Sequence, residues 1–287
     1  MNDNNDNNTP DDPQRRNLFR LAAGIAAAAA ADSVLAATEP DALPRPGDTR
    51  PTVLITGANR GLGFEFSRIY AQQDWRVIAT CRRPAAADAL NTLAGQHEAV
   101  SIEPLDVADH ASVDALAARY REVPIDVLLN NAGISGGGAQ TQVFGRLQYE
   151  VFDDVMRVNA IGPLKMAEAF RDHVRASEQK KIITVSSSQG SIASVRVPML
   201  YWYRSSKSAV NMMMTNLALQ LKRRGVIVGL VTPGVTATDF IDDETKKRIP
   251  GIREPAVAAA DMVRNIERFT LENTGAFFNY DGEIIPW

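Results

Sequence analysis

The stretch PTVLITGANRGLG, residues 51–63, decides the predicted fold. Its first half is a short β-branched run typical of a strand, and its second half places Gly57, Gly61 and Gly63 before the helical pattern GLGFEFSRIYAQQ. Glycines here permit a tight turn, a close approach of backbone to phosphate and close packing of helix on sheet. The positive N-terminus of the following helix favours a pyrophosphate. The spacing is G-x-x-x-G-x-G, which alone also fits a plain glycine-rich turn, but its place between a strand and a helix favours a dinucleotide site.

Strand and helix patterns alternate from Pro51 to the end of the chain. This rhythm predicts an α/β fold: a single-domain, Rossmann-type, doubly wound parallel sheet with helices on both faces. In such sheets ligands bind beyond the carboxyl ends of the strands, so the loops after strands are the informative ones. Strands are predicted at 51–57, 75–82, 99–107, 125–133, 181–188 and 226–234, and helices at 61–73, 85–95, 111–122, 149–174, 203–224 and 255–270.

The loop after the second predicted strand indicates which dinucleotide is bound. A cofactor with a bare 2′-hydroxyl usually meets an acidic residue there, but this chain has Arg82 and Arg83, with Arg60 inside the glycine loop. Guanidinium groups suit a 2′-phosphate, although solvated surface arginines are the alternative. The pattern predicts NADP(H). Further along, Asp106 is placed to accept from an adenine amino group, and NNAG at 130–133 brings backbone close to the cofactor.

The stretch YWYRSSKSAV, residues 201–210, contains two tyrosines and one lysine. Tyr203 and Lys207 are one helical turn apart, whereas Tyr201 has Ser205 at that position. A fixed ammonium one turn away is expected to lower the phenol pKa of Tyr203. Tyr-x-x-x-Lys also arises by chance in many helices, so a catalytic role for this pair needs support from motifs elsewhere in the chain.

Taken together, these motifs resemble the short-chain dehydrogenase/reductase family over nearly all of Thr52–Trp287. The matching set, in order, is TGANRGLG, LDV, NNAG, the asparagine of RVNAIGP, the serines of ITVSSSQG, YRSSK and TPGVTATDF. SSSQGSIAS, YRSSKSAVN and FFNYDGEIIPW are similar to the subgroup of C-factor-like proteins and Sniffer-type carbonyl reductases.

The resemblance implies roles for individual residues. It assigns Tyr203 as the general acid, and Lys207 as the group that lowers its pKa and binds the nicotinamide ribose. Among Ser186, Ser187 and Ser188, the resemblance selects Ser187 as the residue that hydrogen-bonds the substrate oxygen. It implies that Asn159 holds a water molecule of the proton relay. Its implied cofactor-binding residues are Gly57, Asn59, Arg60, Gly61, Leu62, Gly63, Arg82, Asp106, Val107, Asn131, Ala132, Gly133, Tyr203, Lys207, Pro233, Gly234, Thr236 and Thr238.

The function implied is reduction of a ketone or aldehyde to an alcohol with NADPH, and the partner is a small carbonyl or alcohol. Two alternatives stay open: alcohol oxidation with NADP+, and an exported signalling or binding protein that keeps the fold without turnover. The polar segment 239–253 lies where a substrate lid is expected and is predicted to be irregular, and residues 135–145 are predicted to form a second flexible wall. Neither identifies the substrate.

Composition excludes several other classes of protein. The chain has 287 residues, 45% hydrophobic and 23% charged, with a net charge of −3 and no long basic run. Nucleic-acid binding is therefore not expected. The single cysteine, Cys81, forms no internal disulfide, and His97, His110 and His173 lack metal-ligand spacing. No metal is predicted, and assembly with further copies of the chain is left open.

The first fifty residues differ from the rest. Residues 1–37 combine a polar start, Arg15-Arg16 and an alanine-rich apolar run ending in small residues, which is the plan of a twin-arginine export signal. Gln14 and the Leu18-Phe19 order depart from the usual pattern, and a flexible tail with an amphipathic alanine helix is the alternative. The run is too short for a stable membrane span. We expect a linker at 38–50, the domain at 51–287 and a periplasmic location, with the cytoplasm as the alternative.

A reporter fused after Ala37 tests the export signal. We expect it to leave the cytoplasm while Arg15-Arg16 is intact and to stay inside when both are replaced by lysine, because the twin-arginine route reads that pair. Fractionation of reporter activity measures this. Export that persists with Lys-Lys refutes the signal.

Overall fold

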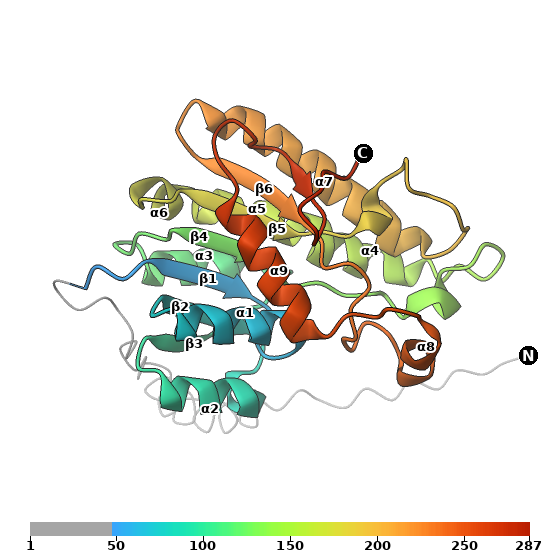
Figure 1. The fold of residues 1–287 in the computed structure, drawn as a ribbon, viewed down its shortest axis with the longest axis horizontal. Helices are drawn as coiled ribbons and strands as arrows, with labels where there is room; N and C mark the ends of the chain where they lie inside the picture. Colours follow the sequence, from blue (N-terminus) through green and yellow to red (C-terminus); the bar gives the residue numbers. More distant parts are fainter. Residues whose placement is uncertain (1–47) are drawn as a thin grey trace, which may run out of the picture. The chain divides into compact units, whose positions relative to one another are not determined.

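The computed structural model describes residues 48–287, except for the side chains of residues 139 and 140. Its centre is a seven-stranded sheet in the order β3-β2-β1-β4-β5-β6-β7, with every neighbouring pair parallel (Figure 1). The order reverses between β1 and β4, which confirms the predicted doubly wound Rossmann-type fold. The strands are β1 (Thr52–Thr56), β2 (Arg76–Cys81), β3 (Val100–Pro104), β4 (Val127–Asn130), β5 (Lys181–Val185), β6 (Ile227–Val231) and β7 (Phe277–Phe278).

Helices cover both faces of this sheet (Figure 1). Alternate residues of β1 point to opposite faces, so Leu54 joins one buried cluster while Val53 and Ile55 join the other. Helices α1 (Gly61–Gln72), α2 (Asp88–Gln96) and α9 (Pro255–Glu267) pack on the side of Val53. Helices α3 (His110–Arg119), α5 (Gly162–Ala169) and α7 (Tyr201–Lys222) pack on the side of Leu54. Burial on both faces explains why the strands read as continuous apolar runs.

The helix predicted at 149–174 is not continuous. It consists of α4 (Glu150–Met156), the π-turn η3 (Arg157–Ile161), α5 and α6 (Arg171–Ala176). Two residues account for the first break. The Asn159 side chain bonds to the backbone of Ile134 in a different loop, and Pro163 has no N–H to donate to the preceding turn.

The expected irregular lid at 239–253 contains a short helix, α8 (Asp243–Arg248), so that prediction is wrong in this part. Asp242 caps the helix by accepting from the Thr245 N–H at 2.9 Å. Acidic residues lie in the first turn and basic residues in the last, which complements the helix dipole. Local capping and charge placement thus favour a helix here, while Arg253 at the end of the segment is bonded to the backbone of Val235 and Ala237 in the loop after β6.

Three further short helices, η1 (Pro84–Ala86), η2 (Gly138–Thr141) and η4 (Ser188–Gly190), lie in loops after strands. The chain end supports the last of these loops. Ser191 Oγ donates to Pro286 O at 2.6 Å, and the Ala193 N–H donates to Trp287 O at 3.0 Å. The Trp287 ring stacks on Phe277 of β7, with centroids 5.8 Å apart. Residues far apart in sequence thus fix the loop after β5 to the edge of the sheet.

Two predicted regions are not covered by this description. The export signal at 1–37 and residues 38–47 of the linker lie outside the described residues. Within residues 48–287, no helix is both long and apolar enough to cross a membrane. In the same range, no three His, Cys, Asp or Glu side chains gather in a way that suits a metal ion.

Candidate active site

The loops after β1 and β4 touch at the point where the strand order reverses. The Thr56 hydroxyl accepts from the N–H groups of Asn131 and Ala132, both at 3.0 Å. In return, Asn131 Nδ2 donates to the carbonyl oxygens of Thr56 at 2.9 Å and Gly57 at 3.2 Å. The Asn131 side chain, predicted to bind cofactor, therefore holds the glycine loop in place. Ala132 packs against Gly57, where an added Cβ would lie 3.0 Å from Ala132 Cα.

The glycine loop suits a pyrophosphate. Gly57 and Gly61 have positive φ angles of 67° and 54°, which favour glycine. A Cβ on Gly63 would lie 2.2 Å from the Gly57 carbonyl oxygen, so this position has room for no side chain. Helix α1 has no side-chain cap and no acidic residue in its first turn. The free N–H groups and the positive dipole end of α1 are thus available to a phosphate. The exposed Asn59 and the partly buried Leu62 lie on either side of the helix start.

The loop after β6 faces the glycine loop. Thr238 Cγ2 would lie 3.5 Å from a Cβ added to Gly61, which places residues 236–238 beside the start of α1. Thr236 is buried, and its hydroxyl donates to the carbonyl oxygens of Pro233 and Gly234 at 3.4 and 3.3 Å. The predicted nicotinamide loop, Pro233 to Thr238, is therefore internally bonded and lies across from the phosphate end of the site.

The predicted 2′-phosphate ligands are exposed. Arg82 and Arg83 follow directly after β2. Arg60 precedes α1, and its Nη1 lies 3.0 Å from the Asp239 carboxylate in the segment after the nicotinamide loop. At the end of β3, Asp106 Oδ1 accepts from the Ala108 N–H at 3.0 Å, and Val107 is buried against Gly162 of α5. Cys81, at the end of β2, is buried, and burial raises the pKa of its thiol.

The structure brings Tyr203 and Ser187 together from α7 and the loop after β5. Ser187 lies near enough to Tyr203 for its hydroxyl to lower the pKa of the phenol. Ser186 does not compete for this place, because it is buried and its hydroxyl donates to Asn211 Oδ1 at 2.6 Å. Ser188 begins η4, one residue further on. Of the three adjacent serines, Ser187 is thus the one whose hydroxyl influences the tyrosine.

Lys207 lies one turn beyond Tyr203 and is buried. Its Nζ donates to the Val185 carbonyl oxygen at 3.0 Å and lies 5.8 Å from the centre of the Tyr203 ring. Burial disfavours the ammonium and lowers the pKa of Lys207 to about 8. The cation is therefore anchored to the end of β5 rather than placed on the phenol oxygen.

One expectation about charge is wrong. We expected Lys207 to give Tyr203 a lowered pKa, but burial raises the pKa of Tyr203 above its usual value. The hydrogen bond with Ser187 acts in the opposite direction and lowers it. The physical reason is desolvation, which disfavours the phenolate more than the surrounding groups favour it.

Asn159 lies in the π-turn η3 and is 1% exposed. Its Oδ1 accepts from the Ile134 N–H at 2.8 Å, and its Nδ2 donates to Ile134 O at 2.9 Å and Ser206 Oγ at 3.0 Å. The Asn159 side chain therefore fixes the loop after β4 to α7, and the predicted water relay stays a prediction.

Gly133 lies between the groups of this centre. A Cβ there would lie 3.2 Å from Asn159 Oδ1, 3.6 Å from Phe240 Cζ and 3.8 Å from Lys207 Nζ. The Phe240 ring also packs edge-on against Tyr203, with centroids 6.3 Å apart. Gly133 follows Ala132, which packs on Gly57, so the predicted catalytic residues lie next to the glycine loop.

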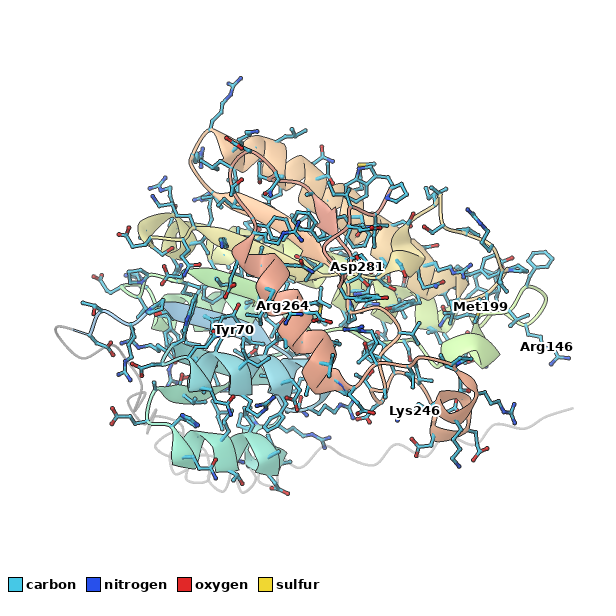
Figure 2. All side chains as sticks on the ribbon, viewed as in Figure 1. Tyr70, Arg146, Met199, Lys246, Arg264 and Asp281 are labelled. Carbon is cyan, nitrogen blue, oxygen red and sulfur yellow. The ribbon has the colours of Figure 1, made fainter. Side chains whose placement is uncertain are left out.

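Three parts of the chain that are distant in sequence lie at the carboxyl end of the sheet. Figure 2 shows Arg146, Met199 and Lys246 at the end of the molecule toward which the strand arrows point. Two residues of this region, Phe240 and Gln142, were not predicted from the sequence. Phe240 belongs to the TPGVTATDF motif but was not singled out, and Gln142 lies in a loop read only as a flexible wall.

Comparison with known proteins agrees with this geometry. Residues 51–249 match the model for short chain dehydrogenases. The 1-hydroxy-2-glutathionyl-2-methyl-3-butene dehydrogenase of Rhodococcus sp. is 34% identical over 242 residues, covering 82% of this chain and 99% of that protein. C-signal of Myxococcus xanthus is 31% identical over 173 residues, covering 60% of this chain and 99% of that protein.

Two solved structures are similar in fold. The NADPH-bound carbonyl reductase from chicken fatty liver has a TM-score of 0.74 and 29% identity, and the Sniffer carbonyl reductase of D. melanogaster has a TM-score of 0.73 and 27% identity. Each comparison covers 83% of this chain and 100% of the other. The expected likeness to C-factor-like and Sniffer-type proteins is confirmed, and the chain belongs to the short-chain dehydrogenase/reductase family of oxidoreductases.

Proposed function

We propose that this protein reduces a ketone or aldehyde to an alcohol with NADPH, with Tyr203 as the proton donor. The observation that carries the proposal is the grouping of Tyr203, Ser187 and Gly133 with the buried Lys207, whose Nζ lies 5.8 Å from the centre of the Tyr203 ring. NADPH, when bound, supplies the hydride. The residues of the chain bind and orient the two reactants, and they provide the proton.

Each residue has a distinct task in this mechanism. Ser187 donates a hydrogen bond to the substrate oxygen and, with Tyr203, holds the developing alkoxide. The high pKa of Tyr203 keeps its hydroxyl protonated at neutral pH, which a proton donor requires. Lys207, anchored to the end of β5, would hold the nicotinamide ribose hydroxyls when the cofactor is bound. Asn159 keeps the loop after β4 against α7, so that these groups face one space.

Cofactor choice rests on Arg60 and Arg82. The pairing of Arg60 with Asp239 is exposed, since the two side chains are 68% and 62% exposed. Such an ion pair stabilises by only about 0–1 kcal/mol. A phosphate bonded to a guanidinium gains more than that, so Asp239 does not keep Arg60 from a 2′-phosphate. The chicken enzyme with bound NADPH supports the same choice.

Relatives support both directions of the reaction and one non-enzymatic alternative. The Rhodococcus relative is named as a dehydrogenase, whereas the chicken and fly proteins are named as carbonyl reductases. C-signal is the relative that favours a signalling role. Against that role, a protein without turnover has no chemical need for a buried lysine beside a tyrosine. Loss of NADPH absorbance across a panel of carbonyls tests the proposal, and tight cofactor binding with no turnover on any of them favours the signalling alternative.

We further propose that the protein is exported to the periplasm. The support is the Arg15-Arg16 pair and the alanine-rich run that follows it. The twin-arginine route carries folded proteins, so an enzyme can be exported with NADP(H) already bound.

Three substitutions in α7 test the assignment of the proton donor. Tyr203→Phe should lower kcat by about 10²- to 10⁴-fold, because the general acid is lost. Its cofactor affinity should stay nearly unchanged. Lys207→Ala should weaken cofactor binding and slow the rate, because the lysine has two tasks. Steady-state kinetics and cofactor fluorescence measure both effects.

Tyr201→Phe is the matched control. It should keep most of the activity, since Tyr201 lies beside Phe144 with ring centroids 6.4 Å apart and has no lysine one turn beyond it. Ser187→Ala should move the high-pH limb of the rate profile upward, because the hydrogen bond that lowers the pKa of Tyr203 is removed. An inactive Tyr201→Phe with an active Tyr203→Phe would overturn the assignment.

Cofactor preference gives a second test. We expect NADPH to bind at least about tenfold more tightly than NADH, about 1.4 kcal/mol, because of one phosphate–guanidinium contact. Arg60→Ala and Arg82→Ala should each reduce this ratio while leaving NADH affinity nearly unchanged. Equal dissociation constants for the two cofactors in the unaltered protein would contradict the prediction.

A further inference from the structure

Gln142 is a fully buried polar side chain in the loop that follows β4. It is 0% exposed and lies between β4 and α4, just after η2. A buried carboxamide costs free energy unless its donors and acceptors are satisfied. The partners of Gln142 are therefore informative about what the loop does.

Both ends of the carboxamide are bonded to backbone. Oε1 accepts from the Tyr203 N–H at 2.8 Å. Nε2 donates to the carbonyl oxygens of Ser135 at 2.7 Å, Gly136 at 3.1 Å and Gly138 at 3.3 Å. One side chain thus connects the loop after β4 to the first turn of α7, and it does so at the tyrosine of the site.

Helix α7 lacks a local cap at this end. Its N-cap residue, Leu200, is in the left-handed region with φ 57° and makes no side-chain cap hydrogen bond. Tyr203 is the third residue of the helix, so its N–H has no partner within the helix. Gln142 satisfies that N–H from 61 residues earlier in the sequence. The capping role usually taken by a nearby Ser, Thr or Asp is supplied by a distant loop.

The carbonyl of Tyr203 is held from the same loop by a second route. Ser206 Oγ donates to Tyr203 O at 2.7 Å and accepts from Asn159 Nδ2 at 3.0 Å. Asn159 in turn bonds both backbone groups of Ile134. Ile134 precedes Ser135, which Gln142 bonds. The two routes therefore form a closed ring of hydrogen bonds around the backbone of Tyr203.

We propose that Gln142 is a positioning residue that sets the place of the Tyr203 hydroxyl relative to Ser187 and Lys207. The inference rests on the proposed function, in which Tyr203 donates the proton. Gln142 does not touch the reacting atoms. It acts by fixing the first turn of α7, from which the phenol projects.

Only a carboxamide fills this place at every pH. A leucine of similar size neither accepts from the Tyr203 N–H nor donates to the carbonyls. An ionised carboxylate accepts from Tyr203 but faces three carbonyl oxygens with no proton to donate. A protonated carboxyl group does both, so Gln142→Glu should regain function as pH falls through the raised pKa of its buried carboxyl group.

The test compares Gln142→Leu and Gln142→Glu with Thr141→Val. Thr141 Oγ1 donates to Gly136 O at 2.6 Å and Gly138 O at 3.2 Å, so Thr141→Val loosens the same loop without removing the contact to Tyr203. We expect Gln142→Leu to lower kcat by about tenfold to a hundredfold with less than a twofold change in cofactor dissociation constant. Thr141→Val should keep kcat within about twofold. Gln142→Glu should approach the unaltered protein at low pH and fall below it at high pH.

A second readout needs no turnover. The ultraviolet titration of each variant, minus that of the same variant with Tyr203→Phe, isolates the ionisation of Tyr203. The groups facing its ring and hydroxyl are Lys207 from α7, Ser187 from the loop after β5 and the uncharged Phe240. Gln142→Leu should shift the pKa of Tyr203, because displacement of the phenol changes both its burial, which raises this pKa, and its contact with Ser187, which lowers it.

The outcomes separate this inference from the proposed function. If the unaltered protein turns over no carbonyl, the proposed function fails, while the titration still decides whether Gln142 positions Tyr203. The inference is overturned if Gln142→Leu and Thr141→Val lower the melting temperature alike and both leave the titration of Tyr203 unchanged. If Gln142→Leu does not fold, Gln142→Glu decides. The inference is overturned if the ratio of its activity to that of the unaltered protein is the same at every pH and the pKa of Tyr203 is unchanged.

Discussion

The contact between the loops after β1 and β4 is the constraint on which the site depends. Thr56 and Asn131 bond these loops together at the point where the strand order reverses. Gly57 and Gly63 leave no room for a Cβ, so backbone meets backbone and the start of α1 stays open to a phosphate. From this contact the loop after β4 continues through Gly133 to Ile134 and Gln142, which reach α7. The single loop after β4 thus connects the cofactor end of the site with the proton-donor end.

Much of this arrangement could be predicted from the sequence, because the signals are local. Strand–loop–helix order fixes which loops lie at the carboxyl edge of the sheet, and Gly57, Gly61 and Gly63 are needed by the turn that contains them. The i, i+4 spacing of Tyr203 and Lys207 likewise depends only on helix geometry. These predictions hold in the structure because a parallel sheet covered on both faces leaves few alternatives.

The rest depends on contacts between segments far apart in the chain. Nothing near Gln142 shows that its partner is the Tyr203 N–H, and nothing near Asn159 shows that its side chain bonds Ile134. The pKa of Tyr203 was predicted from one neighbouring charge, but the depth of burial, which the sequence does not specify, determines its direction. The helix α8 was missed because its stability comes from capping and charge placement in a polar segment without an apolar pattern.

The affinity of Gly63→Ala for NADPH, measured together with its free energy of unfolding, tests the central claim most directly. The added Cβ would lie 2.2 Å from Gly57 O and 2.7 Å from Asn131 Nδ2, and the backbone cannot yield without moving the glycine loop. We expect a loss of stability of about 1–3 kcal/mol and at least a tenfold loss of NADPH affinity, about 1.4 kcal/mol. Gly95→Ala on α2, where a Cβ meets nothing within 4 Å, should keep both. NADPH binding to Gly63→Ala as tight as to the unaltered protein would contradict the claim that this contact builds the cofactor site.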